Sequence, residues 1–443
     1  MKILFVSLGC DKNLVDSEMM LGMLAKEGFS FTDDEREAEI IVINTCCFIH
    51  DAKEESVNTI LEMSELKKEG KLKVLVAAGC LAQRYQAEIR EEIPEVDVII
   101  GTTAIDQIVE AVKEVLAGEE TGLKHIEDIN REPVFGKKRM VTTGGHFAYL
   151  KIAEGCDKHC TYCIIPKLRG SFRSVPMEAL LEEARELADQ GVRELILVAQ
   201  ETTVYGMDIY GRKALPELLD RLNEIPGLYW IRILYCYPEE ITDELIQAIK
   251  RNEKVCHYLD MPIQHGCDGI LKRMGRRTTG SDLRSIIEKL RKEIPDICLR
   301  TTLITGFPGE TEENHEELMQ FVDELEFDRL GVFTYSPEED TPAATMEGQI
   351  SEEVKLERQA CLMELQQEIA YEKAENMIGQ KLMVMIEGKV ADENAYVGRS
   401  YKDAPNVDGY VFVNTEQELM TGAFVPVKIT GSYEYDLIGE IDQ

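Results

Sequence analysis

The chain has 443 residues, a length that at roughly 150 residues per domain suggests about three domains and excludes a single small module. Apolar residues make up 44% and charged residues 30%, which is typical of a soluble globular protein and not of a disordered or fibrous one. The 49 Lys and Arg face 83 Asp and Glu, so the net charge is −34. Such a surface repels phosphates and anionic lipids, which disfavours nucleic acid and membranes as partners and favours a basic partner.

No segment of the sequence predicts export or membrane insertion. The N-terminal apolar run over 3–8 ends before Asp11 and is shorter than the apolar region of a signal peptide. No stretch approaches the roughly 20 apolar residues of a membrane span. We therefore expect a soluble, cytoplasmic protein, in which the 12 cysteines form no disulfides because the cytosol keeps thiols reduced. Metal binding is the first alternative for these cysteines.

The first part of the chain repeats one pattern, in which a short apolar run leads to a cysteine and then to an amphipathic helix. The three cysteines are Cys10, Cys46 and Cys80. The apolar runs cover 3–8, 40–44 and 74–78, helices are expected near 15–27, 52–69 and 82–92, and a fourth strand at 96–100 precedes a helix over 105–116. Each interval between cysteines has the length of one strand-helix-strand unit. In a parallel sheet the three thiols then stand at the carboxyl ends of strands, where open α/β sheets bind ligands.

The rest of the chain divides into a linker, a second α/β region and a small β domain. Apolar runs at 147–153, 194–200, 229–235, 257–263, 298–304 and 329–335 alternate with helical patterns at 177–190, 241–251, 281–293 and 312–325. Six such units predict a partial (β/α)6 barrel. A long charged helix near 351–377 precedes short alternating strands at 382–386, 410–413 and 426–430, which predict a small β-barrel. The predicted fold is α/β multidomain, with a parallel α/β domain over 1–118, a linker over 119–145, a barrel core over 146–374 and a β-barrel over 375–443.

The sharpest motif is a Cys-x3-Cys-x2-Cys run made by Cys156, Cys160 and Cys163, directly after the first strand of the predicted core. Three thiolates this close can hold one small metal centre, and a [4Fe–4S] cube is held by cysteine thiolates. With three protein ligands, one iron stays open to an outside ligand, as in catalytic metal sites that keep a vacant position. The alternative is a structural zinc site closed by His159 or a remote residue, although no second Cys-x2-Cys pair completes the usual zinc spacing.

This thiol triad at the head of a β/α barrel resembles that of the radical S-adenosylmethionine enzymes, whose open iron chelates the amino and carboxylate groups of the cofactor. The resemblance implies that Gln200 and Glu201, after the second strand, bind the cofactor's amino group, although the usual glycines are missing there. It also implies that Gly306 and Gly309, after the fifth strand, let the backbone approach the adenosine. The alternative for these two glycines is a turn that starts the next helix.

Other polar residues near predicted strand ends have two interpretations each. Arg169 and Arg173 either pair with the cofactor's carboxylate or solvate a loop. His265 either lines the site or is a structural histidine, and the same choice holds for Lys167 and Asp260. The sequence alone leaves these alternatives open.

The whole chain is similar to the methylthiotransferases, which combine three N-terminal cysteines, a radical barrel and a TRAM-like C-terminal β-barrel. The resemblance implies that Cys10, Cys46 and Cys80 hold a second [4Fe–4S] cluster linked to the sulfur that is delivered to the substrate. The matching segments are 8–18, 44–49 and 79–85. Two positions depart from the family pattern: Asp11 stands where proline is usual, and Cys47 where glycine is expected. Cys47 therefore competes with Cys46 as ligand, and the strand-end geometry favours Cys46.

Two branches of this family differ in substrate. One modifies a tRNA adenosine (isopentenyladenosine) beside the anticodon, and the other modifies the β-carbon of an aspartate in small-subunit ribosomal protein twelve. Residues 375–443 carry 12 Asp and Glu against 5 Lys and Arg, a net charge of −7. An RNA-binding barrel presents basic and aromatic groups, whereas an acidic barrel suits a basic ribosomal protein. Residues 9–18, 397–405 and 408–409 also resemble the ribosomal-protein branch more closely, so nucleic acid is the disfavoured substrate.

The mechanism that the resemblance implies uses two molecules of S-adenosylmethionine. One is cleaved reductively at the cluster on Cys156, Cys160 and Cys163, with electrons from a donor such as flavodoxin or ferredoxin, and the resulting radical removes a hydrogen from the aspartate β-carbon. The other supplies the methyl group of the thioether. A hypothesis of another class is a non-catalytic iron–sulfur carrier, which binds iron but does not cleave S-adenosylmethionine.

Overall fold

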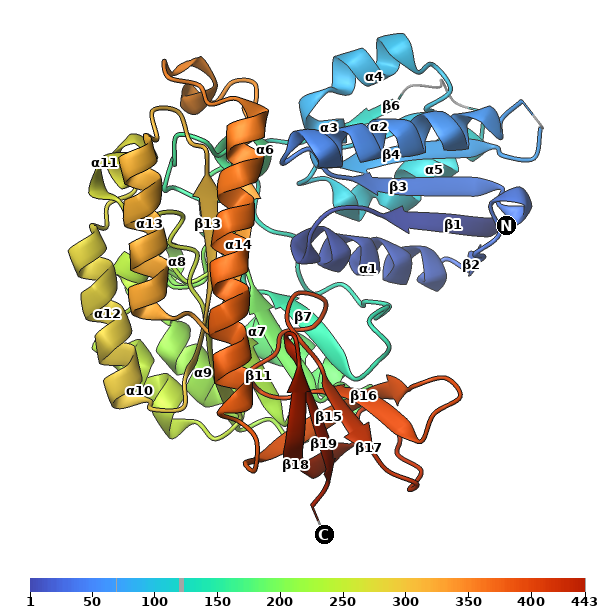
Figure 1. Cartoon of the computed structure of the whole chain (residues 1–443). Helices are drawn as coiled ribbons and strands as arrows, with labels where there is room; N and C mark the ends of the chain where they lie inside the picture. Colours follow the sequence, from blue (N-terminus) through green and yellow to red (C-terminus); the bar gives the residue numbers. More distant parts are fainter. Residues whose placement is uncertain (69, 119–122, 443) are drawn as a thin grey trace.

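The computed structural model describes residues 1–68, 70–118 and 123–442, which form three domains (Figure 1). The N-terminal domain is built on a six-stranded sheet in the order β2-β1-β3-β4-β5-β6, with every pair parallel. Its strands are β1 (Lys2–Ser7), β2 (Ser30–Phe31), β3 (Ile40–Thr45), β4 (Val74–Gly79), β5 (Val98–Ile100) and β6 (Leu123–His125). Its helices are α1 (Asp11–Lys26), α2 (His50–Glu65), α3 (Cys80–Arg84), α4 (Gln86–Glu92) and α5 (Ile108–Leu116). The predicted parallel α/β domain is thus confirmed.

Two details differ from the expectation for this domain. The strand β6 lies inside the range predicted as a linker and pairs with β5. Residue 69, at the end of one predicted helix, and residues 119–122, at the start of the predicted linker, lie outside the described residues. The predicted helix near 82–92 is two short helices, α3 and α4, that meet at Tyr85.

The N-terminal sheet is covered on both faces. Every residue of β3 and β4 is buried, which explains their nearly continuous apolar sequences. One face packs against α1 and α5, and the other packs against α2, α3 and α4. This layered arrangement leaves the carboxyl edge of the sheet, where β1, β3 and β4 end, as the place for a site.

The central domain is an open six-stranded parallel sheet in the order β14-β13-β12-β11-β10-β7, which confirms the predicted partial barrel. These strands are β7 (Phe147–Lys151), β10 (Glu194–Val198), β11 (Trp230–Ile233), β12 (Val255–Asp260), β13 (Cys298–Thr305) and β14 (Arg329–Thr334). The helices are α6 (Ile165–Arg169), α7 (Met177–Asp189), α8 (Met207–Tyr210), α9 (Leu215–Asn223), α10 (Asp243–Arg251), α11 (Asp268–Arg273), α12 (Gly280–Glu293), α13 (Glu312–Leu325) and α14 (Glu352–Glu375). A short antiparallel pair, β8 (Ala153–Glu154) and β9 (Arg173–Ser174), was not predicted from sequence.

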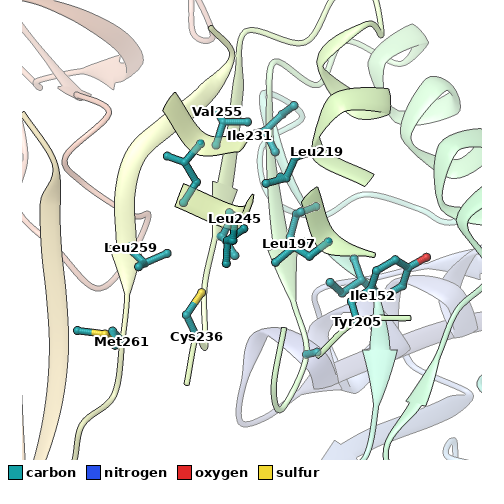
Figure 2. Packing of buried hydrophobic residues seen from close by; sticks show 14 of the residues in the cluster. Ile152, Leu197, Tyr205, Leu219, Ile231, Cys236, Leu245, Val255, Leu259 and Met261 are labelled. Atoms are coloured by element: carbon teal, nitrogen blue, oxygen red, sulfur yellow. The ribbon is translucent and has the colours of Figure 1, made fainter. Parts of the chain in front are cut away.

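The two faces of the central sheet have different neighbours. On the outer face, Leu197 and Ile231 pack against Leu219 of α9 and Leu245 of α10 (Figure 2). On the inner face, the buried side chains belong to a cluster that also contains residues of α1 and of the C-terminal domain. The other two domains therefore close the inner face of the open barrel.

The C-terminal domain is a closed barrel in the order β15-β16-β17-β19-β18, as expected. Its strands are β15 (Lys381–Lys389), β16 (Ala395–Arg399), β17 (Val411–Asn414), β18 (Phe424–Tyr433) and β19 (Asp436–Ile441). Sequence patterns predicted β15, β17 and β18 but not β16 and β19. None of the helices in the described residues has the length and apolarity needed to cross a bilayer.

Candidate functional site

The three N-terminal cysteines lie together at the carboxyl edge of the first sheet. The strand register pairs Ser7 with Asn44 and Thr45 with Gly79, so β1, β3 and β4 end side by side. Cys10 precedes α1, Cys46 follows β3 directly, and Cys80 begins α3. The structure thus brings together the three thiols that the sequence placed at strand ends.

Charges on neighbouring cysteines act on the Cys80 thiol. Burial raises the pKa of the Cys80 thiol well above its usual range, the Arg169 guanidinium opposes this shift, and charge on Cys46, Cys47 and Cys10 adds to it. Gly9 has a φ of +87°, and a Cβ at this position would lie 2.6 Å from the Cβ of Cys46 and 2.9 Å from its Sγ. Any side chain at Gly9 would therefore push the loops of Cys10 and Cys46 apart.

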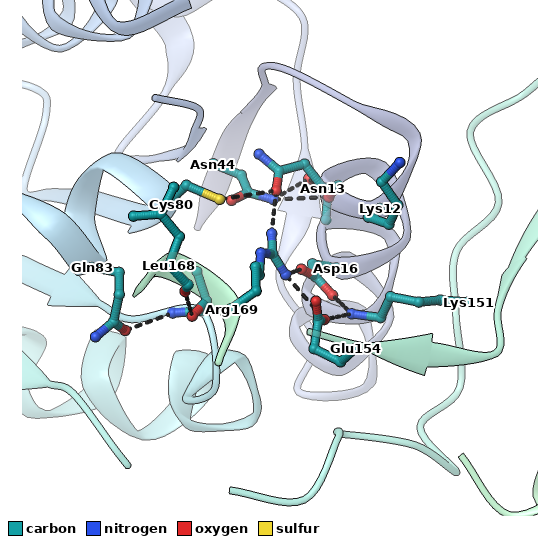
Figure 3. Close-up of polar contacts among 12 residues, drawn as sticks. Lys12, Asn13, Asp16, Asn44, Cys80, Gln83, Lys151, Glu154, Leu168 and Arg169 are labelled. Atoms are coloured by element: carbon teal, nitrogen blue, oxygen red, sulfur yellow. Dashed lines mark hydrogen bonds and ion pairs between the residues drawn. The ribbon is translucent and has the colours of Figure 1, made fainter. Parts of the chain in front are cut away.

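Asn13 contacts all three thiol-bearing segments, and Figure 3 shows it beside Asn44 and Cys80. Its side-chain Nδ2 donates hydrogen bonds to the carbonyl oxygens of Leu8 and Thr45, both at 3.0 Å. Its Oδ1 lies 3.8 Å from the Sγ of Cys80. One buried amide thereby touches the segment before Cys10, the segment before Cys46, and Cys80 itself.

Cys47 has a different environment from Cys46. It is fully buried and packs in the apolar cluster that contains Leu81. Burial and the neighbouring Cys46 raise the pKa of the Cys47 thiol to about 12, while the Arg84 guanidinium opposes the shift. Cys46 packs against Gly9 and its backbone N–H donates to Ser56 Oγ at 3.0 Å. This placement favours Cys46 over Cys47 as the partner of Cys10 and Cys80.

The second triad lies on the loop between β8 and α6. Backbone hydrogen bonds hold this loop, from Cys156 N to Gly170 O at 3.1 Å and from Cys163 N to Cys160 O at 3.0 Å. Burial raises the pKa of Cys163 well above its usual range, and charge on Cys160 and Cys156 adds to the shift. The Sγ of Cys160 lies 3.7 Å from the Tyr237 hydroxyl oxygen. The three thiols therefore share one partly enclosed site, as their spacing predicted.

The donor chemistry of both triads fits an iron–sulfur cube. In the described residues no group of three or more His, Cys, Asp or Glu side chains surrounds a point as the ligands of a single metal ion do. A cube differs from a single ion because each thiolate binds a different iron atom. Three thiolates on each site are the ligands that such a cube needs, with one iron left for an exogenous ligand.

Gln200 and Glu201 follow the end of β10, and Glu201 lies next to this triad. Gln200 Oε1 and Glu201 Oε2 are buried and accept no hydrogen bond within the described part of the chain, although the Lys158 ammonium lies 3.3 Å from Glu201 Oε2. Burial raises the pKa of Glu201 to about 7, and Lys158 opposes this shift. The charge of Glu201 adds to the effect of burial in raising the pKa of Cys156, which places the carboxylate beside the triad. Buried oxygens without donors fit the ammonium group of an amino-acid cofactor.

Gly306 and Gly309 form a turn after β13 with φ values of +70° and +83°. A Cβ at Gly306 would lie 2.3 Å from Cγ of Lys355, and one at Gly309 would lie 2.8 Å from Cζ of Arg273. Side chains of the protein itself thus occupy the space that the missing Cβ atoms leave. The turn and this packing account for both glycines. Between them, Phe307 packs edge-on against Tyr162 of the thiol loop, with ring centroids 6.4 Å apart.

The two thiol-bearing segments adjoin the contact between the first two domains. Helix α6, which follows Cys163, packs against α3, which begins at Cys80 (Figure 1). Leu168 of α6 is buried in the same apolar cluster as Cys80. The end of one thiol loop is therefore attached to the start of the other thiol-bearing helix.

Arg169, at the end of α6, contacts the N-terminal domain directly (Figure 3). Its Nη1 lies 2.8 Å from Asp16 Oδ2 and 3.1 Å from Glu154 Oε2, and its Nη2 donates to Asn13 Oδ1. Arg169 is buried and its donors serve the protein, so the expectation that it pairs with a cofactor or solvates a loop does not describe it. Arg173 donates from Nη2 to the carbonyl oxygen of Arg169 at 2.9 Å.

Several residues at this junction escaped the sequence reasoning. Asn13 and Asp16 lie in the segment 8–18 that marked the first cysteine, but nothing in the sequence pairs them with Arg169. Tyr237 and Arg276, whose guanidinium lies 4.3 Å from the Tyr237 ring centroid, surround Cys160 without a motif. His265 is fully buried, and its Nδ1 accepts a hydrogen bond from Cys267 N, as expected of a structural histidine.

Comparisons with known proteins agree with this three-domain plan. Residues 2–101 match the family model described as uncharacterized protein family UPF0004, residues 150–322 match the radical SAM superfamily, and residues 378–441 match the TRAM domain. A protein of Lachnoclostridium phytofermentans named ribosomal protein uS12 methylthiotransferase RimO is 64% identical, with 99% of each chain covered. A protein of the same name from Clostridioides difficile is 48% identical, covering 100% of this chain and 99% of that one.

Solved structures support the fold. The radical S-adenosylmethionine methyltransferase TsrM from Kitasatospora setae superposes with a TM-score of 0.55 at 15% identity, covering 88% of this chain and 79% of that one. The cobalamin-dependent radical enzyme OxsB superposes with a TM-score of 0.52 at 15% identity, covering 82% of this chain and 56% of that one.

Proposed function

The chain belongs to the family of ribosomal protein uS12 methylthiotransferases, and from this premise we propose that it adds a methylthio group to the β-carbon of an aspartate in small-subunit ribosomal protein twelve. The observation that carries the proposal is the juxtaposition of two thiol triads through α3 and α6. A thiomethylation needs a radical centre and a sulfur source next to one substrate carbon. Two triads that meet at a domain contact supply both places.

We assign one [4Fe–4S] cluster to Cys10, Cys46 and Cys80 and a second to Cys156, Cys160 and Cys163. When bound, the clusters and S-adenosylmethionine supply the electron, the radical, the sulfur and the methyl group of the reaction. The protein's residues bind and orient these groups. Glu201 offers its Oε2, which has the Lys158 ammonium 3.3 Å away, to the cofactor's ammonium. Gln200 is held for the same task by a 2.7 Å hydrogen bond from its Nε2 to Glu154 Oε1.

The side chains around the second triad supply a fixed charge and an apolar wall. Although burial opposes it, Arg169 and Lys151 lower the pKa of Glu154 to about 2, so this carboxylate stays charged and keeps its orientation. Phe307 and Tyr162 form an apolar wall beside the thiol loop. A fixed charge and an apolar wall beside the thiol loop suit a radical that reacts with any nearby C–H bond.

The charge of the C-terminal barrel supports a basic protein substrate. Two of its acidic residues, Asp403 and Asp408, are buried and pair with Arg329 and Arg300 of the central domain. Four other acids, Asp392, Glu393, Glu416 and Glu418, are exposed on two loops of the barrel. Exposed acidic loops attract a basic ribosomal protein and repel tRNA. The proposal includes a cytoplasmic location and an electron donor such as flavodoxin or ferredoxin.

The test is an assay of the anaerobically reconstituted enzyme with ribosomal protein twelve and, in parallel, with tRNA. We expect a methylthio product on one aspartate of the protein, located by mass spectrometry of its peptides, and no product on tRNA. A variant with Cys156, Cys160 and Cys163 changed to alanine is the matched control. Thiomethylation of tRNA alone would contradict the substrate assignment, and failure to cleave S-adenosylmethionine on reduction would favour the iron–sulfur carrier.

A further inference from the structure

The Asn13 side chain links segments of the N-terminal thiol site. The two N–H groups of the Asn13 amide are both used, one for each of the carbonyl oxygens of Leu8 and Thr45. A third contact comes from Asn44, whose Nδ2 donates to the backbone oxygen of Asn13 at 2.9 Å. Asn13 itself is fully buried. The Asn13 amide thereby joins the loops before Cys10 and Cys46, which a backbone hydrogen bond from Leu8 N to Asn44 O at 2.9 Å also joins, and it lies against Cys80.

The remaining polar atom of this amide is held from outside the domain. Oδ1 of Asn13 accepts a hydrogen bond from Nη2 of Arg169, a residue 156 positions further along the chain. The other end of the same guanidinium is fixed by ion pairs with Asp16 and Glu154. Since an amide can turn about its last side-chain bond, a donor on Oδ1 decides which way its oxygen and nitrogen face.

We propose that Asn13 and Arg169 are a pair of positioning residues, through which the central domain fixes the arrangement of the three N-terminal thiols that hold the second cluster. This inference rests on the proposed ligand set Cys10, Cys46 and Cys80. The N-terminal site is then completed by the neighbouring domain, and it is not an independent metal-binding module.

The bonding pattern distinguishes conservative replacements. Asn13→Asp keeps an oxygen for Arg169 but loses both donors, so a carboxylate would face the carbonyl oxygens of Leu8 and Thr45. Arg169→Lys keeps the charge near Asp16 and Glu154, yet an ammonium cannot reproduce the planar fork that contacts three partners at once. Both changes preserve the approximate volume of the side chain.

The experiment measures the N-terminal cluster alone. Full-length protein with Cys156, Cys160 and Cys163 replaced by alanine serves as the parent and is expected to retain about four irons per chain after reconstitution. In this parent, we expect Asn13→Asp to lower bound iron at least about twofold and to change the EPR spectrum of the reduced cluster. Arg169→Lys is expected to change the same spectrum with a smaller loss of iron. Circular dichroism verifies that each variant is folded.

Arg139→Met is the matched control. Arg139 is also buried, and it pairs with Glu18 of the same helix α1 and with Glu183 of the central domain, but it touches none of the thiol loops. We expect this variant to keep the parent's iron and spectrum.

Three results would overturn the inference. Folded Asn13→Asp and Arg169→Lys proteins with the parent's iron content and spectrum would show that the pair has no positioning role. An equal loss of iron in Arg139→Met would assign the effect to general weakening of α1. A parent that binds no iron would instead refute the ligand set itself, and with it the inference. If Asn13→Asp does not fold, Arg169→Lys decides the question by its spectrum.

Discussion

The two ends of strand β10 lie at two domain contacts that differ in how their carboxylates are satisfied. At the amino end, Glu194 is fully buried and both its oxygens are paired, Oε1 with Arg232 Nε and Oε2 with Arg399 Nη2 of the C-terminal barrel, each at 2.7 Å. At the carboxyl end, Gln200 Oε1 is buried and accepts no hydrogen bond from the described residues, and Glu201 Oε2 has the Lys158 ammonium 3.3 Å away. At the first contact, both carboxylate oxygens of Glu194 have partners within the chain. The second leaves acceptor atoms for a group that is not part of the chain.

The largest effects are expected from the thiols at the carboxyl end. Replacing Cys156, Cys160 and Cys163 together by alanine should lower bound iron from about eight to about four per chain and abolish reductive cleavage of S-adenosylmethionine. Replacing Cys10, Cys46 and Cys80 should remove the same amount of iron but leave that cleavage measurable as 5′-deoxyadenosine. Iron analysis and chromatography of the nucleoside products check both results. Equal loss of cleavage in both variants would contradict the proposal that only the cluster on Cys156, Cys160 and Cys163 cleaves S-adenosylmethionine.

At the amino end the expected loss is one of stability. Glu194→Ala leaves Arg232 and Arg399 buried without their shared carboxylate, and removing one partner of a buried ion pair costs about 3–5 kcal/mol. Urea denaturation measures the free energy of unfolding. Iron content and cofactor cleavage per folded molecule should stay unchanged, because Glu194 lies at the opposite end of β10 from the thiols. A cleavage defect as large as the stability defect would contradict the contrast between the two ends.

Glu201 and Glu194 should change the stability of the folded protein with pH in opposite directions. Burial raises the pKa of Glu201 to about 7, so the folded protein holds this proton more tightly than the unfolded chain, and its contribution to stability is lost as pH rises from about 4.5 to about 7. Glu201→Gln should therefore stabilise the cluster-free protein by about 3 kcal/mol at pH 8 and change little at pH 4.5. Although burial opposes it, Arg399 and Arg232 lower the pKa of Glu194, whose stabilisation is lost only as pH falls below its usual range.

Denaturation of the cluster-free protein at several pH values checks this prediction, with Glu194→Gln as the counterpart. That variant should be most destabilised near neutral pH, where Glu194 is charged and paired. If Glu201→Gln stabilises the protein equally at every pH, the gain in the free energy of unfolding does not come from removing a buried negative charge, and the prediction is wrong.

The smallest effect is expected at Cys47. Cys47→Ala removes a thiol that lies in the apolar cluster with Leu81, so we expect unchanged iron and a loss of about 1 kcal/mol in the free energy of unfolding. Iron analysis of this variant beside Cys46→Ala separates the two cysteines. Loss of a cluster from Cys47→Ala with retention in Cys46→Ala would reverse the ligand assignment.

The sequence could predict the features that depend on local periodicity. Six strands of the central sheet, the cysteines at strand ends and the closed C-terminal barrel all follow from apolar runs and the turn residues that separate them. The short pair β8 and β9 has too few residues to produce a pattern, although it brackets the thiol loop. Local signals of this kind say where a strand lies but not which distant side chain it meets.

The parts of the site that escaped prediction are contacts between residues far apart in the chain. From the sequence, Arg169 is expected to pair with the cofactor's carboxylate or to solvate a loop, whereas it binds Asn13 and Asp16 of another domain. The net charge of residues 375–443 overstates the charge on the barrel surface, because Asp403 and Asp408 are neutralised by Arg329 and Arg300. Gly306 and Gly309 are required by Lys355 and Arg273, which no spacing rule connects to them.

The closure of the inner face of the central sheet has a consequence for how the molecule unfolds. Ile3 and Val15 of the first domain, Tyr258 of the second and Met385 of the third belong to one hydrophobic cluster. Removing either flanking domain would expose apolar side chains that the open barrel cannot cover by itself. The three domains should therefore melt in one cooperative calorimetric transition, and a chain shortened before residue 375 should aggregate instead of behaving as a smaller enzyme.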